Sequence, residues 1–299
     1  MSSDAATGST RPVVVGVDGL RRVAGTIDLA ALEAARRGTQ LLIVHVWPGR
    51  YRGAVRVSGA SSSRDDGWRL LEVAERRAHF AVPDLPVRTE LREGVAAAVL
   101  ADCSAGARLL VTGNRDRFRK GTSWGSTAAY LARHSVCPLL VDRGADHDGP
   151  VVVASSARPG GTAALGYAFA EASLVGSRLV AVHMWTRPAG IDGSAPLMTR
   201  GGWAVERRAA ADRLARAVDT WSGRFPEVNV EHLTVSDLDM AGTIEAASRR
   251  GRLLVGGIGR LGLFTELLYG PSGPTLCPVL LVPNDWPVMD RRSRPAVTC

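Results

Sequence analysis

A duplication constrains the fold of this sequence more than any other feature. Four segments of the first half return in the second half in the same order. The matched pairs begin at Pro12 and Pro150, Leu41 and Leu179, Arg108 and Arg252, and Cys137 and Cys277. Four matches in one order indicate one ancestral domain present twice. A chain of 299 residues suits two such domains, which we place at residues 1–147 and 148–299.

Composition limits the class of protein. The apolar fraction of 45% and the charged fraction of 22% are typical of soluble globular chains. No apolar run approaches the ~20 residues that span a bilayer, and the first residues lack the pattern of a signal peptide. These features predict a cytoplasmic protein with no membrane partner. The net charge is +8 without a basic block, so nucleic acid is not a favoured partner.

The cysteines predict no metal site and no disulfide framework, because none of the four forms a Cys-x2-Cys pair. Cys137 and Cys277 each precede proline and an apolar run. We therefore expect both to be small buried residues at strand starts. Cys103 and Cys299 carry no readable role.

The apolar runs and helical stretches alternate, which predicts an α/β fold with parallel sheets and helices on both faces. Each copy supplies five predicted strands. In the first copy these are Val13–Val17, Leu41–Val46, Val87–Leu91, Leu109–Thr112 and Leu139–Val141. In the second they are Val151–Ala154, Leu179–His183, Val228–Leu233, Leu253–Val255 and Val279–Val282.

The predicted helices lie between these strands. In the first copy they are Ile27–Arg37, Trp68–Phe80, Val95–Ala105 and Ser126–His134, and in the second Thr162–Val175, Ala204–Trp221 and Met240–Arg249. Two Gly-rich and Ser-rich segments occupy the same place in each copy, Gly49–Gly67 and Arg187–Gly202. We interpret them as loops after the second strand.

Polar and glycine residues follow two strands of the first copy. Asp18 follows the first strand, Gly113 ends the fourth, and Gly125-Ser126-Thr127 opens the next helix. Ligands of open parallel sheets bind beyond the carboxyl ends of the strands, and a helix start with glycine favours phosphate. The spacing indicates a nucleotide site, although Gly-Ser-Thr is also an ordinary helix cap.

The ordered set of motifs resembles the universal stress protein family in a tandem arrangement, over nearly the whole chain. The pieces that carry the resemblance are Val15–Gly19, Leu41–Trp47, Glu93–Ala96, the glycine loop 113–127 and Ala132–Val141. The resemblance implies two five-stranded, Rossmann-like sheets similar to adenine-nucleotide hydrolases. It also implies that domains pair through their last strands. One branch of the family binds ATP through an Asp after the first strand and a Gly-x2-Gly-x9-Gly-Ser/Thr loop.

Carried over by this resemblance, Asp18 after Val17 contacts the adenosine part of the nucleotide, and backbone at Val46 contacts adenine. Gly113 is the first loop glycine, and Gly125, Ser126 and Thr127 complete the phosphate loop, with Mg²⁺ as a companion ion. The second loop glycine is replaced by Asp116, and the following gap is one residue short. Arg115 and its neighbouring basic residues offset the charge of Asp116 or simply form a solvated loop.

The second copy departs further from the ATP-binding pattern. Ser156 stands in place of the Asp, and Arg260 in place of the second glycine. Gly270 lies 7 residues before Cys277, whereas Gly125 lies 12 before Cys137, which removes about 1.4 helical turns. Pro271 lacks the N–H that a phosphate uses. We predict that the second copy does not bind ATP.

The resemblance, together with these features, implies a stress-response regulator or binding module with at most one adenine-nucleotide site, and not an enzyme. Two alternatives stay open: a nucleotide-free interaction scaffold, and a slow ATPase or adenylate hydrolase with Asp116 as its acid or base. His45 and His183 repeat in equivalent places and are interpreted as hydrogen-bonded strand-end residues. The last strands are expected to pair within the chain, and association of two chains is left open.

Overall fold

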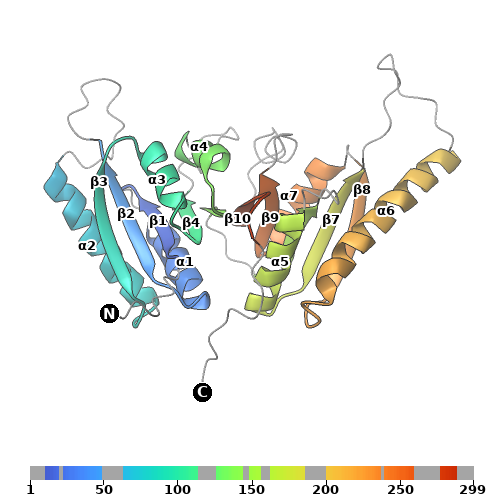
Figure 1. Ribbon diagram of the computed structural model, residues 1–299, viewed down its shortest axis with the longest axis horizontal. Coiled ribbons are helices and arrows are strands. Elements are labelled where there is room, and N and C mark those ends of the chain that lie inside the picture. The colour runs from blue at the N-terminus through green and yellow to red at the C-terminus, as the bar shows by residue number, and fades with distance from the viewer. Residues whose placement is uncertain are drawn as a thin grey trace, which may run out of the picture. The chain divides into compact units, whose positions relative to one another are not determined.

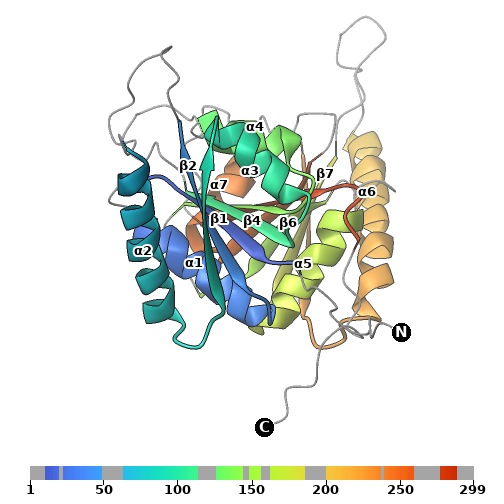
Figure 2. The same cartoon turned by 60° about the vertical axis from the view of Figure 1, so that its left-hand side comes forward.

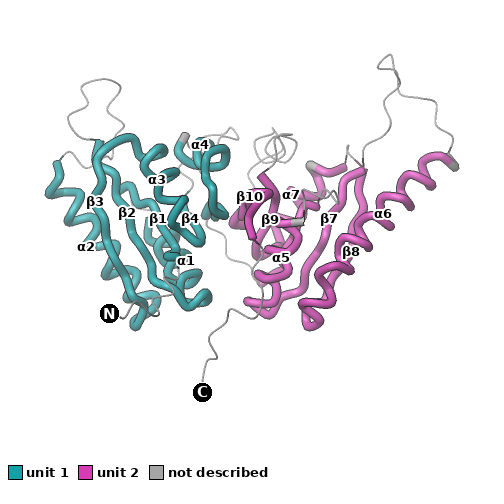
Figure 3. The backbone as a smooth tube through the Cα atoms, in the orientation of Figure 1, with its two compact units in different colours: residues 1–115, 124–142 teal, residues 116–123, 143–299 magenta. Residues whose placement is uncertain are grey.

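The computed structural model describes nine stretches of the chain. They are residues 11–19, 23–48, 63–113, 126–143, 148–155, 162–185, 200–236, 239–258 and 277–287. These residues form two compact units, coloured separately in Figure 3. Unit 1 holds the described residues up to Asp142, and unit 2 holds those from Arg143 onward.

Unit 1 contains one parallel sheet with the strand order β3-β2-β1-β4-β5. Its elements in chain order are β1 (Val13–Val17), α1 (Val23–Arg36), β2 (Leu41–Trp47), α2 (Arg64–Ala81), β3 (Val87–Glu93), α3 (Ala96–Ser104), β4 (Leu109–Gly113), α4 (Ser126–His134) and β5 (Leu139–Asp142). Helices α1 and α2 pack together, as do α3 and α4, and the two pairs lie on opposite faces of the sheet (Figure 2).

Unit 2 repeats the arrangement with the strand order β10-β9-β6-β7-β8, again parallel. Its elements are β6 (Val151–Ser155), α5 (Thr162–Val175), β7 (Leu179–Trp185), α6 (Arg200–Ser222), β8 (Val230–Ser236), α7 (Met240–Arg250), β9 (Leu253–Ile258) and β10 (Val279–Pro283). Helices α5 and α6 pack together beside this sheet (Figure 1). The predicted fold class, two tandem five-stranded parallel-sheet domains, is confirmed.

Burial explains why the inner strands read as continuous apolar runs. Val13, Val15, Ile43 and Leu109 in unit 1 have no exposed side-chain surface, because helices cover both faces of a parallel sheet. The outermost strand, β3, contains mostly polar residues, and none of its residues is fully buried. None of the described helices is long and apolar enough to span a membrane.

Several element boundaries differ from those expected. Helix α2 begins at Arg64, four residues early, because Ser63 caps it: the Ser63 hydroxyl accepts a hydrogen bond from the Asp66 N–H at 3.1 Å. Both α2 and α6 therefore begin within the segments interpreted as loops. Strand β8 begins two residues later than expected, because Val228 belongs to the turn after α6 and donates its N–H to the Phe225 carbonyl.

The first helix of each unit packs on the second helix through different chemistry. In unit 1, Arg77 of α2 donates from Nε to Asp28 of α1 at 2.7 Å, and a second bond joins the same pair. In unit 2, Gly166 of α5 lets the Trp221 ring of α6 approach, so that an added Cβ would lie 2.5 Å from the ring. The duplicated helices thus kept their places while their contacts changed.

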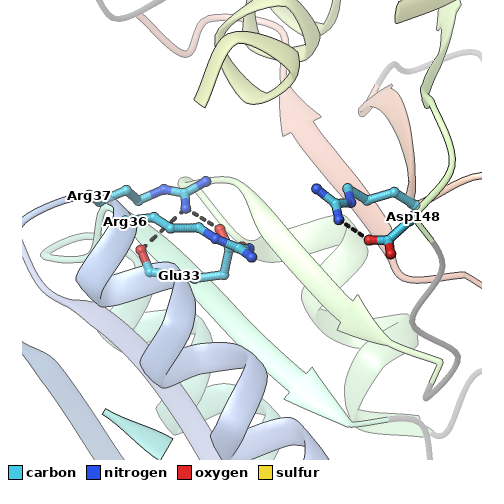
Figure 4. A network of polar contacts seen from close by, with 5 residues as sticks. Glu33, Arg36, Arg37 and Asp148 are labelled. Carbon is cyan, nitrogen blue, oxygen red and sulfur yellow. Dashed lines mark hydrogen bonds and ion pairs between the residues drawn. The ribbon is translucent and has the colours of Figure 1, made fainter. Parts of the chain in front are cut away.

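Helix α1 also carries a buried carboxylate. Glu33 accepts a bond from Arg36 at 2.8 Å and is paired with the buried Arg37, as Figure 4 shows. The other ion pair in Figure 4 joins Asp148 to Arg252 at 2.8 Å within unit 2. Burying a carboxylate is costly unless a cation accompanies it, and the two arginines meet that need at the end of α1.

Candidate functional site

The strand order of unit 1 reverses between β1 and β4, which places the carboxyl ends of these strands on either side of the switch point. Their ladder pairs Val13 with Leu109 and ends at Val15 with Val111. Both strands continue for two more residues, to Val17 and Gly113. The strands therefore extend past their last mutual pair, at the position where ligands of open α/β sheets bind.

The predicted adenosine-side residues lie at this edge. Val17 is buried as the last residue of β1, and Asp18 follows it with an exposed side chain. Val46 lies on the neighbouring strand β2, one residue beyond His45, which pairs with Val17. The three residues that the resemblance assigned to adenosine and adenine thus come together at the carboxyl ends of two adjacent strands.

His45 contacts the backbone of β1 just before Asp18. Its Nδ1 lies 2.8 Å from the Val17 carbonyl oxygen, and its side chain is 4% exposed. The distance and the acceptor assign the Nδ1–H as donor. The other edge of the ring approaches α2, where Gly67 leaves room for it: an added Cβ would lie 3.1 Å from His45 Cδ2.

Unit 2 has the same arrangement, with His183 Nδ1 2.8 Å from the Ser155 carbonyl. Its side chain is 5% exposed. The interpretation of both histidines as hydrogen-bonded strand-end residues is confirmed.

Gly113 begins the candidate phosphate loop, and a polar pair lies beside it. The Thr26 hydroxyl donates to Asp142 Oδ2 at 2.7 Å, and an added Cβ on Gly113 would lie 3.0 Å from Thr26 Oγ1. Sequence reasoning missed this pair. Thr26 and Asp142 are separated by 116 residues, and the only signal was that Asp142 follows a strand at the same edge.

The remaining predicted phosphate-side residues are only partly described. Ser126 begins α4 and Thr127 follows it with a half-buried side chain. Arg115, Asp116 and Gly125 lie outside the described residues. The described part therefore holds the two ends of the candidate loop, Gly113 and the start of α4.

The equivalent edge of unit 2 differs in its strand pairing and in the side chains beside its glycine. The β6–β9 ladder continues one pair further than the ladder of unit 1, to Ala154 with Gly256. Near Gly257, an added Cβ would lie 3.3 Å from Asn284 Oδ1 and 3.8 Å from the Ala164 methyl. Ser156, Arg260, Gly270 and Pro271, which the sequence singled out, lie outside the described residues.

The cysteines and metal-ligating residues of the described part supply no second site. Within these residues, no group of three or more His, Cys, Asp or Glu side chains is placed to hold a metal ion. Cys137 and Cys277 are buried just before β5 and β10, as expected. Desolvation raises the pKa of Cys137 to about 11 and that of Cys277 to about 12, so both thiols stay protonated at neutral pH.

Comparisons with known proteins agree with this architecture. Residues 9–143 match the model of the universal stress protein family. A universal stress protein of Mycolicibacterium smegmatis is 29% identical over 275 residues, covering 86% of this chain and 90% of the relative. The universal stress protein Rv2623 of Mycobacterium tuberculosis is 26% identical over 295 residues, covering 92% and 95%.

Solved structures show the same two-domain fold along most of the chain. A universal stress protein from Archaeoglobus fulgidus superposes with a TM-score of 0.61 at 12% identity, over 91% of this chain and 96% of that one. The protein PA1789 of Pseudomonas aeruginosa, described as functionally unknown, gives 0.62 at 14% identity, over 91% and 92%. Unit 1 thus matches the universal stress protein family model, and the chain as a whole is similar to two-domain universal stress proteins along most of its length.

Proposed function

We propose that this protein is a cytoplasmic stress-response binding module with one adenine-nucleotide site, in unit 1. The observation that supports it is the edge between β1 and β4, where the ladder stops at Val15 and Val111 while Asp18 and Gly113 lie beyond. Asp18 would accept hydrogen bonds from ribose or adenine. Backbone at Val46 would contact the base, and the Gly113 to Thr127 segment would hold phosphate, with Mg²⁺ when ATP is the ligand.

Binding rather than turnover is the proposed role. His45 pairs in register with Val17, which precedes Asp18, and its Nδ1 is engaged by the Val17 carbonyl in a buried position. That contact suits a structural role better than general-base catalysis, which needs a ring nitrogen within reach of the substrate. Unit 2 is proposed to be free of nucleotide, consistent with the β6–β9 ladder, which continues to Ala154 and Gly256 at the equivalent edge.

Calorimetric titration tests this proposal. Wild-type protein should bind adenosine and Mg²⁺-ATP, and Asp18→Ala should weaken both about 10-fold to 100-fold, because a hydrogen bond to a charged group is lost. Asp84→Ala is the matched control, since Asp84 is exposed in the turn before β3 at the opposite edge of the sheet. Its affinities should equal those of the wild type.

The two alternatives give different results in the same experiment. Absence of heat at millimolar adenosine and ATP would favour a nucleotide-free interaction scaffold. Steady release of phosphate from ATP, abolished by Asp116→Ala, would favour a slow ATPase. Binding that is lost in Asp18→Ala without release of phosphate supports the proposed module.

A further inference from the structure

A carboxylate lies at the point where the candidate phosphate loop begins. Asp142, the last residue of β5, pairs in register with Gly113, the last residue of β4. Thr26 of α1 donates to Asp142 Oδ2 at 2.7 Å, and its Oγ1 lies 3.0 Å from the Cβ position of Gly113. One helix and two strands therefore converge on this acidic group.

The same carboxylate lies against the first turn of α1. Asp142 Oδ2 is 3.9 Å from the Cβ position of Gly25, and α1 begins at Val23. The amino end of a helix carries partial positive charge and favours an anion. In unit 1 the Asp142 carboxylate lies beside this first turn and in register with Gly113, so a ligand phosphate near Gly113 meets negative charge.

Unit 2 does not repeat this feature. By the register of the duplicated strands, Val282 stands opposite Gly257 where Asp142 stands opposite Gly113. The alanine that approaches Gly257, Ala164, lies where Thr26 lies in unit 1. At these equivalent positions unit 2 therefore has neither the carboxylate nor its hydroxyl partner.

We propose that Asp142, held in place by Thr26, selects ligands of this site by their phosphate charge, so that adenosine and AMP bind better than metal-free ATP. This inference rests on the proposed nucleotide site. Like charges a few ångströms apart repel through Coulomb's law, and the repulsion grows with the charge of the ligand. Asp142 acts as a specificity-determining residue, and Mg²⁺ bound to ATP reduces the penalty by neutralising phosphate charge.

The test compares three dissociation constants in EDTA at low salt, for adenosine, AMP and ATP. In Asp142→Asn the affinity for ATP should rise about 3-fold to 10-fold, that for AMP less, and that for adenosine not at all. The gain should shrink in 0.5 M salt because screening weakens repulsion between partly exposed charges. Asp84→Asn, which removes the same charge at the opposite edge of the sheet, should leave all three constants unchanged.

A second variant distinguishes loss of charge from loss of folding. Asp142→Glu keeps the charge and should retain the wild-type order of affinities, and circular dichroism establishes that each variant is folded. Equal changes for all three ligands in Asp142→Asn, or no change, would overturn the charge selection while leaving the site intact. If wild-type protein binds none of the three ligands, the proposed nucleotide site itself is wrong.

Discussion

At the scale of single residues, the two buried histidines donate to equivalent backbone carbonyls, but only His45 lies beside the candidate nucleotide site. His45→Ala and His183→Ala should each lower the free energy of unfolding by about 2–4 kcal/mol, because each leaves a buried carbonyl without its donor and a cavity behind it. Urea denaturation measures this. Only His45→Ala should also weaken adenosine binding, since the Val17 carbonyl precedes Asp18.

His79→Ala is the control for both histidine variants, because His79 is exposed in α2, where its Nδ1 lies 3.2 Å from the Pro83 carbonyl oxygen. It should alter neither stability nor binding. Equal loss of adenosine affinity in His45→Ala and His183→Ala would contradict a specific role for His45 in placing Asp18.

The buried thiols make a second prediction at this scale. With pKa values of about 11 and 12, about one Cys137 in a thousand is thiolate at pH 8, and fewer at Cys277. Iodoacetamide should therefore leave peptides that contain these residues unmodified in native protein and should label them in denaturant. Mass spectrometry reads the outcome, and rapid labelling of native protein would show that the two strand starts open.

At the scale of elements, the sequence predicted the strands and helices that are duplicated or have a regular apolar pattern. The apolar runs of β1, β2 and β7 and the helix Thr162–Val175 appear nearly as expected, since burial on both faces leaves a continuous pattern. Boundaries failed where a cap decided them, as at Ser63. The sequence did not predict the Thr26–Asp142 pair, because a contact between two distant segments leaves no local pattern. The pair could be recognised only in the folded structure.

Two helical glycines should respond oppositely to alanine. Alanine usually stabilises a helix by up to about 1 kcal/mol relative to glycine. At Gly242 in α7 an added Cβ meets nothing within 4 Å, so Gly242→Ala should raise the melting temperature. At Gly166 the Cβ would lie 2.5 Å from the Trp221 ring, so Gly166→Ala should lower it. Stabilisation by both changes would show that α5 and α6 shift apart without cost.

At the scale of the whole molecule, each sheet has an end strand formed by the last strand of its unit, β5 in unit 1 and β10 in unit 2. Their side chains are apolar, with Leu139, Val141, Val279 and Val282 fully buried. An apolar edge with unpaired N–H groups promotes aggregation when it is bare. This is the physical reason to expect the last strands to pair within the chain, as the family resemblance implied.

Hydrogen exchange resolved by residue tests that pairing. Pro138 accepts from Leu110 of β4, so by the alternation of a parallel ladder the amides of Leu139 and Val141 point away from β4. The reference amides are those of Thr89 and Leu91 on the outer strand β3, which point away from β2 because the Pro86 carbonyl accepts from β2. If the last strands pair, the amides of Leu139 and Val141 should exchange at least about 100-fold more slowly than these reference amides.

To separate pairing within one chain from pairing between two chains, hydrogen exchange is measured at a protein concentration where light scattering shows a monomer. Protection of Leu139 and Val141 that persists there assigns the partner strand to the same molecule. Protection that disappears on dilution assigns it to a second copy. Exchange as fast as that of Thr89 and Leu91 at every concentration means that β5 is a bare edge. The solubility of the protein must then depend on another feature, such as the charged residues at the end of the strand, Asp142 and the following Arg143.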